Sequence, residues 1–261
     1  MIRTVLEPTK NIKDICNFLD GIFILNLISR QDRYEHVINQ LDQFPGLKER
    51  VYIIRSEKDP DGDFRKGCYE SHKFASDLSL DKKFNMSLIL EDDFVIKDKN
   101  FFDKLEKYYH KLPNNFIRLM VGHIPILPKY SFKNKLFYGK TLCTTSYMFS
   151  KNYAEWLPDW ENFLKKEEDI TELQRFFGKG LDHTLSHLLQ NDTYLCIPSL
   201  IYVDENIGTN TEHGSNFWGS KNLLTTERGQ KFIQFLPFII YIYIVLIIIT
   251  LIVFIYFKLI R

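Results

Sequence analysis

The chain has 261 residues, with 34 Lys+Arg against 33 Asp+Glu and a formal net charge of +1. This length suits one well-buried α/β domain, and the balanced charge lacks the basic field typical of nucleic-acid-binding proteins, so no nucleic-acid partner is expected. The four cysteines lie far apart without a CxxC pair, which removes the usual zinc and redox signatures and favours reduced, mostly buried thiols.

Short apolar runs alternate with amphipathic stretches in the first half of the chain. Strand-length runs occur at 21–27, 51–54, 86–90 and 116–121. Apolar residues at helical spacing follow at 34–41, 67–80 and 101–112. This alternation predicts an α/β fold with a mostly parallel sheet.

The second half of the chain continues this pattern less regularly. Residues 125–139 are expected to form an irregular, aromatic-bearing loop, and 167–177 a charged helix or loop. Strands are predicted at 144–149 and 194–197, helices at 152–163 and 183–190, and a long loop at 198–227.

The run at 87–90 ends in three consecutive carboxylates, Glu91, Asp92 and Asp93. Like charges at the end of a buried strand repel one another and resist desolvation, so a positive partner is expected there. A divalent cation shared with a phosphate-bearing substrate fits hard oxygen ligands, and ligands of open α/β sheets collect at the carboxyl ends of strands. The alternative is an acidic loop that faces water.

Residues 235–257 carry no charge and consist of Ile, Leu, Val, Phe and Tyr apart from Pro237 and Thr250. As a helix they reach roughly 35 Å, against about 30 Å for a hydrocarbon core. They predict one C-terminal transmembrane helix, a single-pass anchor with the folded domain on the cytosolic side. A buried core helix is the alternative.

Six segments share one further resemblance. They are 24–27 with Arg30, Asp32 and Arg33; Gly67-Cys68 with Ser71-His72; the run 88–93; the run 145–151; Leu181-Asp182-His183; and Ile197-Pro198-Ser199 with the polar tail around Ser215. In this order they resemble the signature segments of glycosyltransferase family 25, which includes lipooligosaccharide sugar transferases and procollagen galactosyltransferases. The resemblance covers roughly residues 21 to 218.

The resemblance implies a GT-A fold, a Rossmann-like α/β sandwich that binds a nucleotide-sugar and a divalent metal, Mn²⁺ or Mg²⁺, and transfers the sugar with inversion. Asp93 then stands as the first metal ligand, with Glu91 or Asp92 assisting. Asp182 stands as the general base, although an N-cap role for it remains open. His213 stands as a late ligand to the metal or pyrophosphate.

The resemblance also implies a nucleotide site. Arginines can hold phosphate or stack on the base, while Arg30 or Arg33 could instead pair with Asp32 at the surface. His72 could equally be an interior histidine. The residues assigned to nucleotide binding are Asn26, Arg30, Asp32, Arg33, Ser71, His72, Glu91 and Asp92.

Together these features predict a metal-dependent inverting glycosyltransferase. It moves a sugar, galactose or glucose being the candidates, from a UDP-linked donor to a hydroxyl acceptor on a glycan, lipid-glycan or protein. The expected organisation is a lead-in at 1–20, a GT-A domain at 21–218, a linker at 219–234 and a tail anchor at 235–257. The alternatives are a catalytically degenerate, membrane-tethered binding protein and a metal-dependent phosphoesterase.

Overall fold

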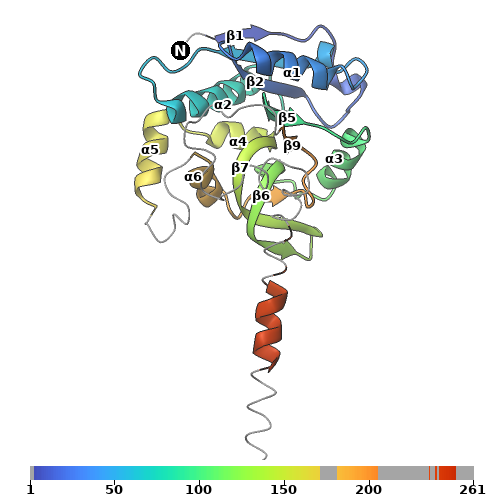
Figure 1. The fold of residues 1–261 in the computed structure, drawn as a ribbon, viewed down its shortest axis with the longest axis vertical. Coiled ribbons are helices and arrows are strands. Elements are labelled where there is room, and N and C mark those ends of the chain that lie inside the picture. The colour runs from blue at the N-terminus through green and yellow to red at the C-terminus, as the bar shows by residue number, and fades with distance from the viewer. Residues whose placement is uncertain (1–2, 171–180, 205–234, 236–238, 240, 251–261) are drawn as a thin grey trace, which may run out of the picture.

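The computed structural model describes residues 3–170, 181–204, 235, 239 and 241–250 (Figure 1). A seven-stranded sheet has the order β1-β3-β2-β4-β7-β6-β8, and a two-stranded sheet pairs β5 with β9. The strands are β1 (Arg3–Leu6), β2 (Gly21–Leu27), β3 (Tyr52–Ser56), β4 (Met86–Glu91), β5 (Phe94–Val95), β6 (Arg118–Ser131), β7 (Leu136–Ser150), β8 (Thr193–Leu195) and β9 (Tyr202–Val203). The helices are α1 (Gln31–Leu41), α2 (Phe64–Asp81), α3 (Phe101–Tyr109), α4 (Lys151–Trp156), α5 (Trp160–Glu168) and α6 (Leu181–Leu188), with short 3-10 turns η1 (Ile12–Asp14) and η2 (Lys48–Arg50).

The large sheet is mixed, and the prediction of a mostly parallel sheet is wrong. Parallel pairing joins β3 to β2, β2 to β4 and β6 to β8. Antiparallel pairing joins β1 to β3, β4 to β7, β6 to β7 and β7 to β8. The reason lies in the second half of the chain, where β6 and β7 follow one another through a short connection, and such a connection permits only antiparallel pairing.

The order in which the chain adds strands to the sheet reverses at β2. The chain leaves β2 through α1 to reach β3 on one side, and then passes through α2 to β4 on the other side of β2. Leu25 of β2 lies opposite Glu91 of β4, so the carboxyl ends of these two strands are neighbours. In open α/β sheets this topological switch point is where ligands bind.

Two apolar clusters cover the two faces of the sheet. Ile22 and Ile24 face one cluster, which includes side chains of α1 and α3. Phe23 and Leu25 face the other, which includes side chains of α2, α4, α5 and α6. Burial of β2 on both faces explains why its sequence reads as a continuous apolar run. Packing of these two clusters against the sheet fixes the positions of the strand ends and of the polar side chains on them.

Two sequence predictions in the second half are corrected. The irregular loop expected at 125–139 is a long β-hairpin formed by β6 and β7. Register shifts near Met120, Gly122 and Ile126 interrupt the ladder, and such irregularities let proline occur within a strand. The single helix expected at 152–163 is split into α4 and α5, because Pro158 cannot continue a helix.

Residues 3–20 take part in the fold. β1 pairs with β3 along four residues and forms one edge of the large sheet. Ile12, Cys16 and Leu19 are buried in the cluster that also packs against α1. The linker predicted at 219–234 lies outside the described residues.

The predicted membrane anchor is corrected as well. Across the described residues, no helix combines the length and the apolar character that a membrane crossing requires. The predictions of a single-pass C-terminal anchor and of the cytosolic placement that followed from it are therefore wrong. Within 235–257, residues 236–238, 240 and 251–257 lie outside the described residues.

A buried histidine makes the stability of the fold depend on pH. His123 in β6 is 5% exposed, and burial together with the charge of Arg118 lowers its pKa from 6.5 to about 3. Below pH 6.5 the unfolded chain binds a proton at His123 that the folded chain does not, so stability is lost as pH falls from about 6.5 toward 3. We expect His123 to lower the free energy of unfolding by about 2 kcal/mol at pH 5 relative to pH 7.

Denaturant titrations of wild type and His123→Gln at pH 7 and pH 5 measure this effect. The variant should lose less free energy of unfolding between the two pH values than wild type does. The exposed His110→Gln variant serves as the control and should follow wild type. An equal pH dependence in wild type and His123→Gln contradicts the assignment.

Candidate functional site

The middle carboxylate of the acidic triplet is buried in a hydrogen-bonded ion pair. Asp92 Oδ1 lies 2.5 Å from Nη1 of Arg33, and Asp92 Oδ2 accepts a 2.8 Å hydrogen bond from Nδ2 of Asn26. The side chains of Arg33 and Asp92 are 4% and 6% exposed. Asp92 therefore links the end of β4 to the first turn of α1 and to β2. These contacts give Asp92 a structural role.

Asp93 is the carboxylate of the triplet that has a buried oxygen without a hydrogen-bond partner among the described residues. Its Oδ2 lies 3.3 Å from Nη1 of Arg33, and its buried Oδ1 has no hydrogen-bond partner within the described residues. Burial, and then the charge of Glu91, raise the pKa of Asp93 from 3.8 to about 7, while Arg33 opposes the rise. A buried oxygen without a donor, in a field that penalises negative charge, is suited to a cation ligand.

Glu91 begins a chain of hydrogen-bonded side chains that leads into the protein interior. Its Oε1 lies 3.3 Å from Nε2 of His72, whose Nδ1 lies 2.9 Å from the hydroxyl of Tyr147. That hydroxyl lies 3.2 Å from the hydroxyl of Tyr153. Both tyrosines are fully buried, and His72 is 2% exposed. The chain fixes the orientation of the His72 ring and holds Glu91 toward α2.

The side-chain amide of Asn26 makes hydrogen bonds to neighbouring residues through both its nitrogen and its oxygen. Its amide nitrogen donates to Asp92 and, at 3.4 Å, to the carbonyl of Arg30, and its Oδ1 accepts from Nε of Arg55 at 3.2 Å. Arg55 in turn lies 4.4 Å above the ring centroid of Tyr34. Asn26 thus joins the ends of β2, β3 and β4 at the switch point.

The other residues assigned to the nucleotide differ in their surroundings. Arg30 makes two hydrogen bonds, of 2.9 and 2.7 Å, to Asp32, which lowers the pKa of Asp32 to about 2. The Asp32 side chain is 61% exposed, so this is the surface pair that the sequence left open for Arg30. Ser71 donates at 2.8 Å to the carbonyl of Gly67 within α2. The structure brings Asn26, Arg33, His72 and the triplet together at one edge of the sheet.

The predicted base and the predicted late ligand to the metal or pyrophosphate both fall at the limits of the described residues. Asp182 is the second residue of α6, and its side chain is outside the described residues. His213 lies wholly outside them. The positions of the predicted base and the predicted late ligand relative to Asp93 therefore stay predictions.

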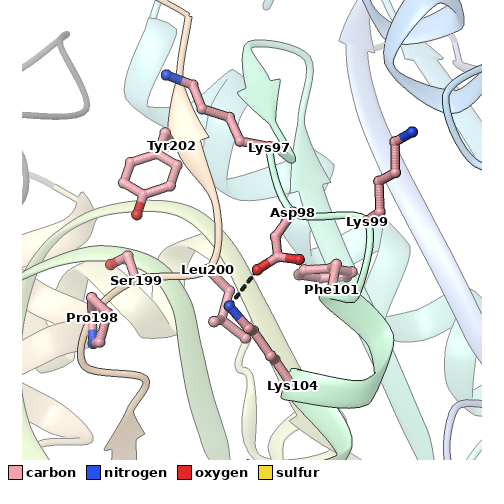
Figure 2. A pocket seen from close by; sticks show the side chains of 9 residues that line it. All are labelled: Lys97, Asp98, Lys99, Phe101, Lys104, Pro198, Ser199, Leu200 and Tyr202. Carbon is pink, nitrogen blue, oxygen red and sulfur yellow. Dashed lines mark hydrogen bonds and ion pairs between the residues drawn. The ribbon is translucent and has the colours of Figure 1, made fainter.

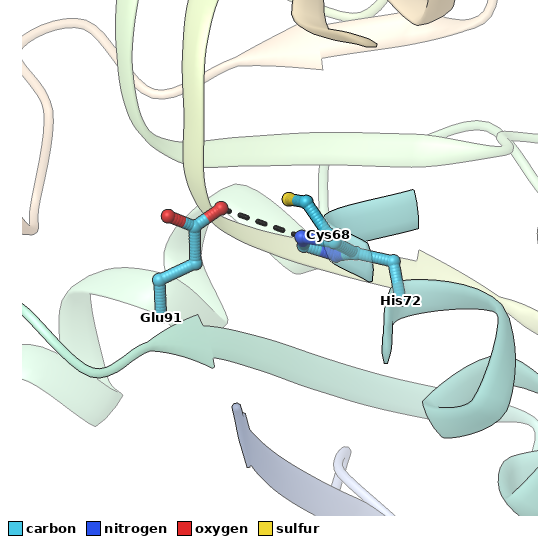
Figure 3. A group of neighbouring side chains, drawn as sticks. All are labelled: Cys68, His72 and Glu91. Carbon is cyan, nitrogen blue, oxygen red and sulfur yellow. Dashed lines mark hydrogen bonds and ion pairs between the residues drawn. The ribbon is translucent and has the colours of Figure 1, made fainter. Parts of the chain in front are cut away.

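Sequence reasoning missed Cys68, Arg55 and Tyr147 as neighbours of the acidic end. Cys68 lies on α2 one turn before His72 and faces Glu91 (Figure 3). The i, i+4 spacing of Cys68 and His72 was a signal available in the sequence, because residues so spaced share one helix face. Tyr147 gave no such signal, since its contact with His72 depends on the antiparallel placement of β7 beside β4.

A separate cavity of about 510 Å³ lies beside β5 and β9 (Figure 2). Lys97, Lys99 and Lys104 line it, and Lys104 is held by Asp98. The aromatic side chains of Phe101 and Tyr202 also reach this cavity. Of the residues predicted for the nucleotide or the metal, those that the structure describes do not line it.

Comparisons with known proteins give a likeness in architecture alone. No protein-family model and no curated protein matches the chain. A solved glycosyltransferase involved in the glycosylation of the major capsid of PBCV-1 is similar at a TM-score of 0.42 and 10% identity, over 67% of this chain and 81% of that one. A protein assigned as a glucose-1-phosphate thymidylyltransferase from Bacillus anthracis, in complex with sucrose, is similar at a TM-score of 0.35 and 9% identity, over 67% and 85%. At TM-scores this low, function has to be inferred from the side chains themselves, and family 25 stays a resemblance.

Proposed function

We propose that the chain is a metal-dependent transferase that moves a sugar from a nucleotide-sugar, UDP-linked, to a hydroxyl acceptor on a glycan, lipid-glycan or protein. The observation that carries the proposal is the acidic triplet at the carboxyl end of β4, beside β2 at the switch point of the sheet. Four of the six segments that resemble family 25 supply side chains to this group: Asn26 and Arg33, His72, the triplet, and Tyr147 behind His72. An inverting transfer by a GT-A enzyme is the reaction that the resemblance implies.

Asp93 and Glu91 are the residues proposed to hold Mn²⁺ or Mg²⁺. The buried Oδ1 of Asp93, which has no hydrogen-bond partner among the described residues, and the pairing of both Asp92 and Asp93 with the single cation of Arg33 fit a divalent cation. Such an ion supplies charge that stabilises a leaving nucleoside diphosphate. Arg33 stays with Asp92, and Arg30, the N-cap residue of α1, is proposed to bind phosphate in place of Asp32.

The acceptor hydroxyl needs a base, and Asp182 is proposed for that role. A carboxylate can take a proton from an acceptor hydroxyl when it lies within hydrogen-bond reach of it. His213 is proposed as a further contact to the metal or the diphosphate. Both assignments rest on the resemblance to family 25.

Calorimetric titration of UDP into the protein tests the proposal. We expect binding with Mn²⁺ present and binding at least tenfold weaker with EDTA, because a divalent ion held at the acidic strand end would offset the charge of the diphosphate. Titration of inorganic phosphate under the same conditions is the control for a phosphoesterase. Binding of UDP that is unaffected by EDTA contradicts a metal-bridged donor site.

A further inference from the structure

A second group of metal-binding side chains lies beside the acidic triplet but uses different donor atoms. The sulfur of Cys68, a ring nitrogen of His72 and a carboxylate oxygen of Glu91 all lie within 4.8 Å of one another (Figure 3). Among the residues that the structure describes, this is the one group of three whose donor atoms come so close. We propose that Cys68, His72 and Glu91 bind one transition-metal ion, zinc being the preferred one. The proposal does not depend on the proposed transferase activity.

The spacing of the donors fits a tetrahedral ion. Bonds of about 2.0–2.2 Å from zinc to nitrogen and oxygen place neighbouring ligand atoms about 3.3–3.5 Å apart. His72 Nε2 and Glu91 Oε1 lie 3.3 Å apart, which is such an edge. The longer zinc–sulfur bond of about 2.3 Å needs the thiolate slightly farther away, within reach of a rotation of the exposed Cys68 side chain.

The surroundings of His72 match those of a metal-binding histidine. Such histidines hold their second nitrogen in a hydrogen bond, which fixes the ring. Here Nδ1 of His72 lies 2.9 Å from the buried hydroxyl of Tyr147, and Tyr153 lies behind it. When Nε2 takes the metal, the ring proton resides on Nδ1 and donates to Tyr147. The Cys68 thiol loses the one proton that is released.

The donor set selects the kind of ion. A thiolate and a carboxylate supply two negative charges, which neutralise one divalent cation. Sulfur and imidazole favour zinc over the oxygen-seeking Mg²⁺ and Mn²⁺ proposed at Asp93. Three protein ligands leave a fourth position for water or substrate, as in catalytic zinc sites. Glu91 has a second carboxylate oxygen, so this site and the Asp93 site can share the strand end.

Titration of the purified metal-free protein with Co²⁺, followed by absorption spectroscopy, tests this inference. We expect intense visible bands of tetrahedral Co²⁺ and a thiolate-to-cobalt charge-transfer band, both saturating at one equivalent and both removed by Zn²⁺. Cys68→Ser should abolish the charge-transfer band and weaken binding at least tenfold. Tyr147→Phe should weaken binding about tenfold while keeping the band, because it alters only the support of His72.

An exposed pair provides the matched control. Glu106 of α3 lies 3.6 Å from His110, the C-cap of that helix, a separation close to that of His72 and Glu91, and among the described residues this pair belongs to no group of three close donors. His110→Gln should leave the cobalt spectrum unchanged. A spectrum without the charge-transfer band, or one that Cys68→Ser does not alter, overturns the proposal. Cys68 is exposed, so its serine variant should fold, and circular dichroism verifies this. The assay contains no nucleotide, so its outcome is separate from that of the UDP titration.

Discussion

Asp93→Asn should reduce metal-dependent turnover of a nucleotide-sugar by at least a thousandfold. The substitution preserves shape but removes the carboxylate whose Oδ1 has no partner in the described residues and whose Oδ2 faces Arg33. Loss of a ligand at a metal that neutralises a leaving diphosphate removes stabilisation that exists mainly in the transition state. The assay is release of UDP from a UDP-sugar with Mn²⁺ present, followed for wild type and variant.

The same variant should not lose stability when the metal is absent. Burial and the Glu91 charge oppose ionisation of Asp93, so a neutral amide relieves a penalty. Thermal unfolding in EDTA at pH 8 should give Asp93→Asn a melting temperature equal to or above that of wild type. Asp98→Asn is the control, since that carboxylate is bonded to exposed Lys104 away from the triplet, and it should retain turnover. Full activity of Asp93→Asn removes the metal assignment.

Arg33→Met should destabilise the protein by about 3–5 kcal/mol. Arg33 is buried and pairs with Asp92 and Asp93, so its loss leaves two buried carboxylates without their cation. The free energy of unfolding from urea titration at pH 8 measures the effect. The double variant Arg33→Met with Asp92→Asn should recover part of the loss, because one of the stranded charges is then gone.

Arg30, the N-cap residue of α1, provides a comparison with Arg33 for the effect of an arginine substitution on stability. Arg30 pairs with Asp32, whose side chain is 61% exposed, and exposed pairs contribute about 0–1 kcal/mol. Arg30→Met should therefore leave stability nearly unchanged. Equal effects of Arg30→Met and Arg33→Met contradict the view that Arg33 and Asp92 form the buried junction between α1 and β4.

The first half of the fold was predictable because each element carries its own local signal. The run 21–27 is apolar on both faces, and β2 occupies those residues between two buried clusters. The second half was not predictable in the same way. Proline in β6 reads as a loop breaker, and only register shifts in the β6–β7 pairing make it compatible with a strand.

In the candidate site, too, the features with a local sequence signal were predictable and those that depend on strand pairing were not. Sequence adjacency identified the triplet, and the apolar run before it placed the triplet at a strand end. Sequence could not assign Asp92 to Arg33 and Asn26, because that choice depends on how β2 and β4 meet. The difference between Arg30 and Arg33 likewise follows from which side of the first turn of α1 faces the sheet, and the spacing of the two residues alone leaves this open.

We propose that the acidic end of β4 belongs to a site that turns over a nucleotide-sugar with the help of a divalent cation. The most direct measurement is UDP release by the wild-type protein from a panel of UDP-sugars, detected by mass spectrometry with Mn²⁺ and with EDTA. We expect release from at least one donor with Mn²⁺ and none with EDTA. Release that is equal in EDTA, or no release from any donor by protein that binds Mn²⁺, contradicts the account.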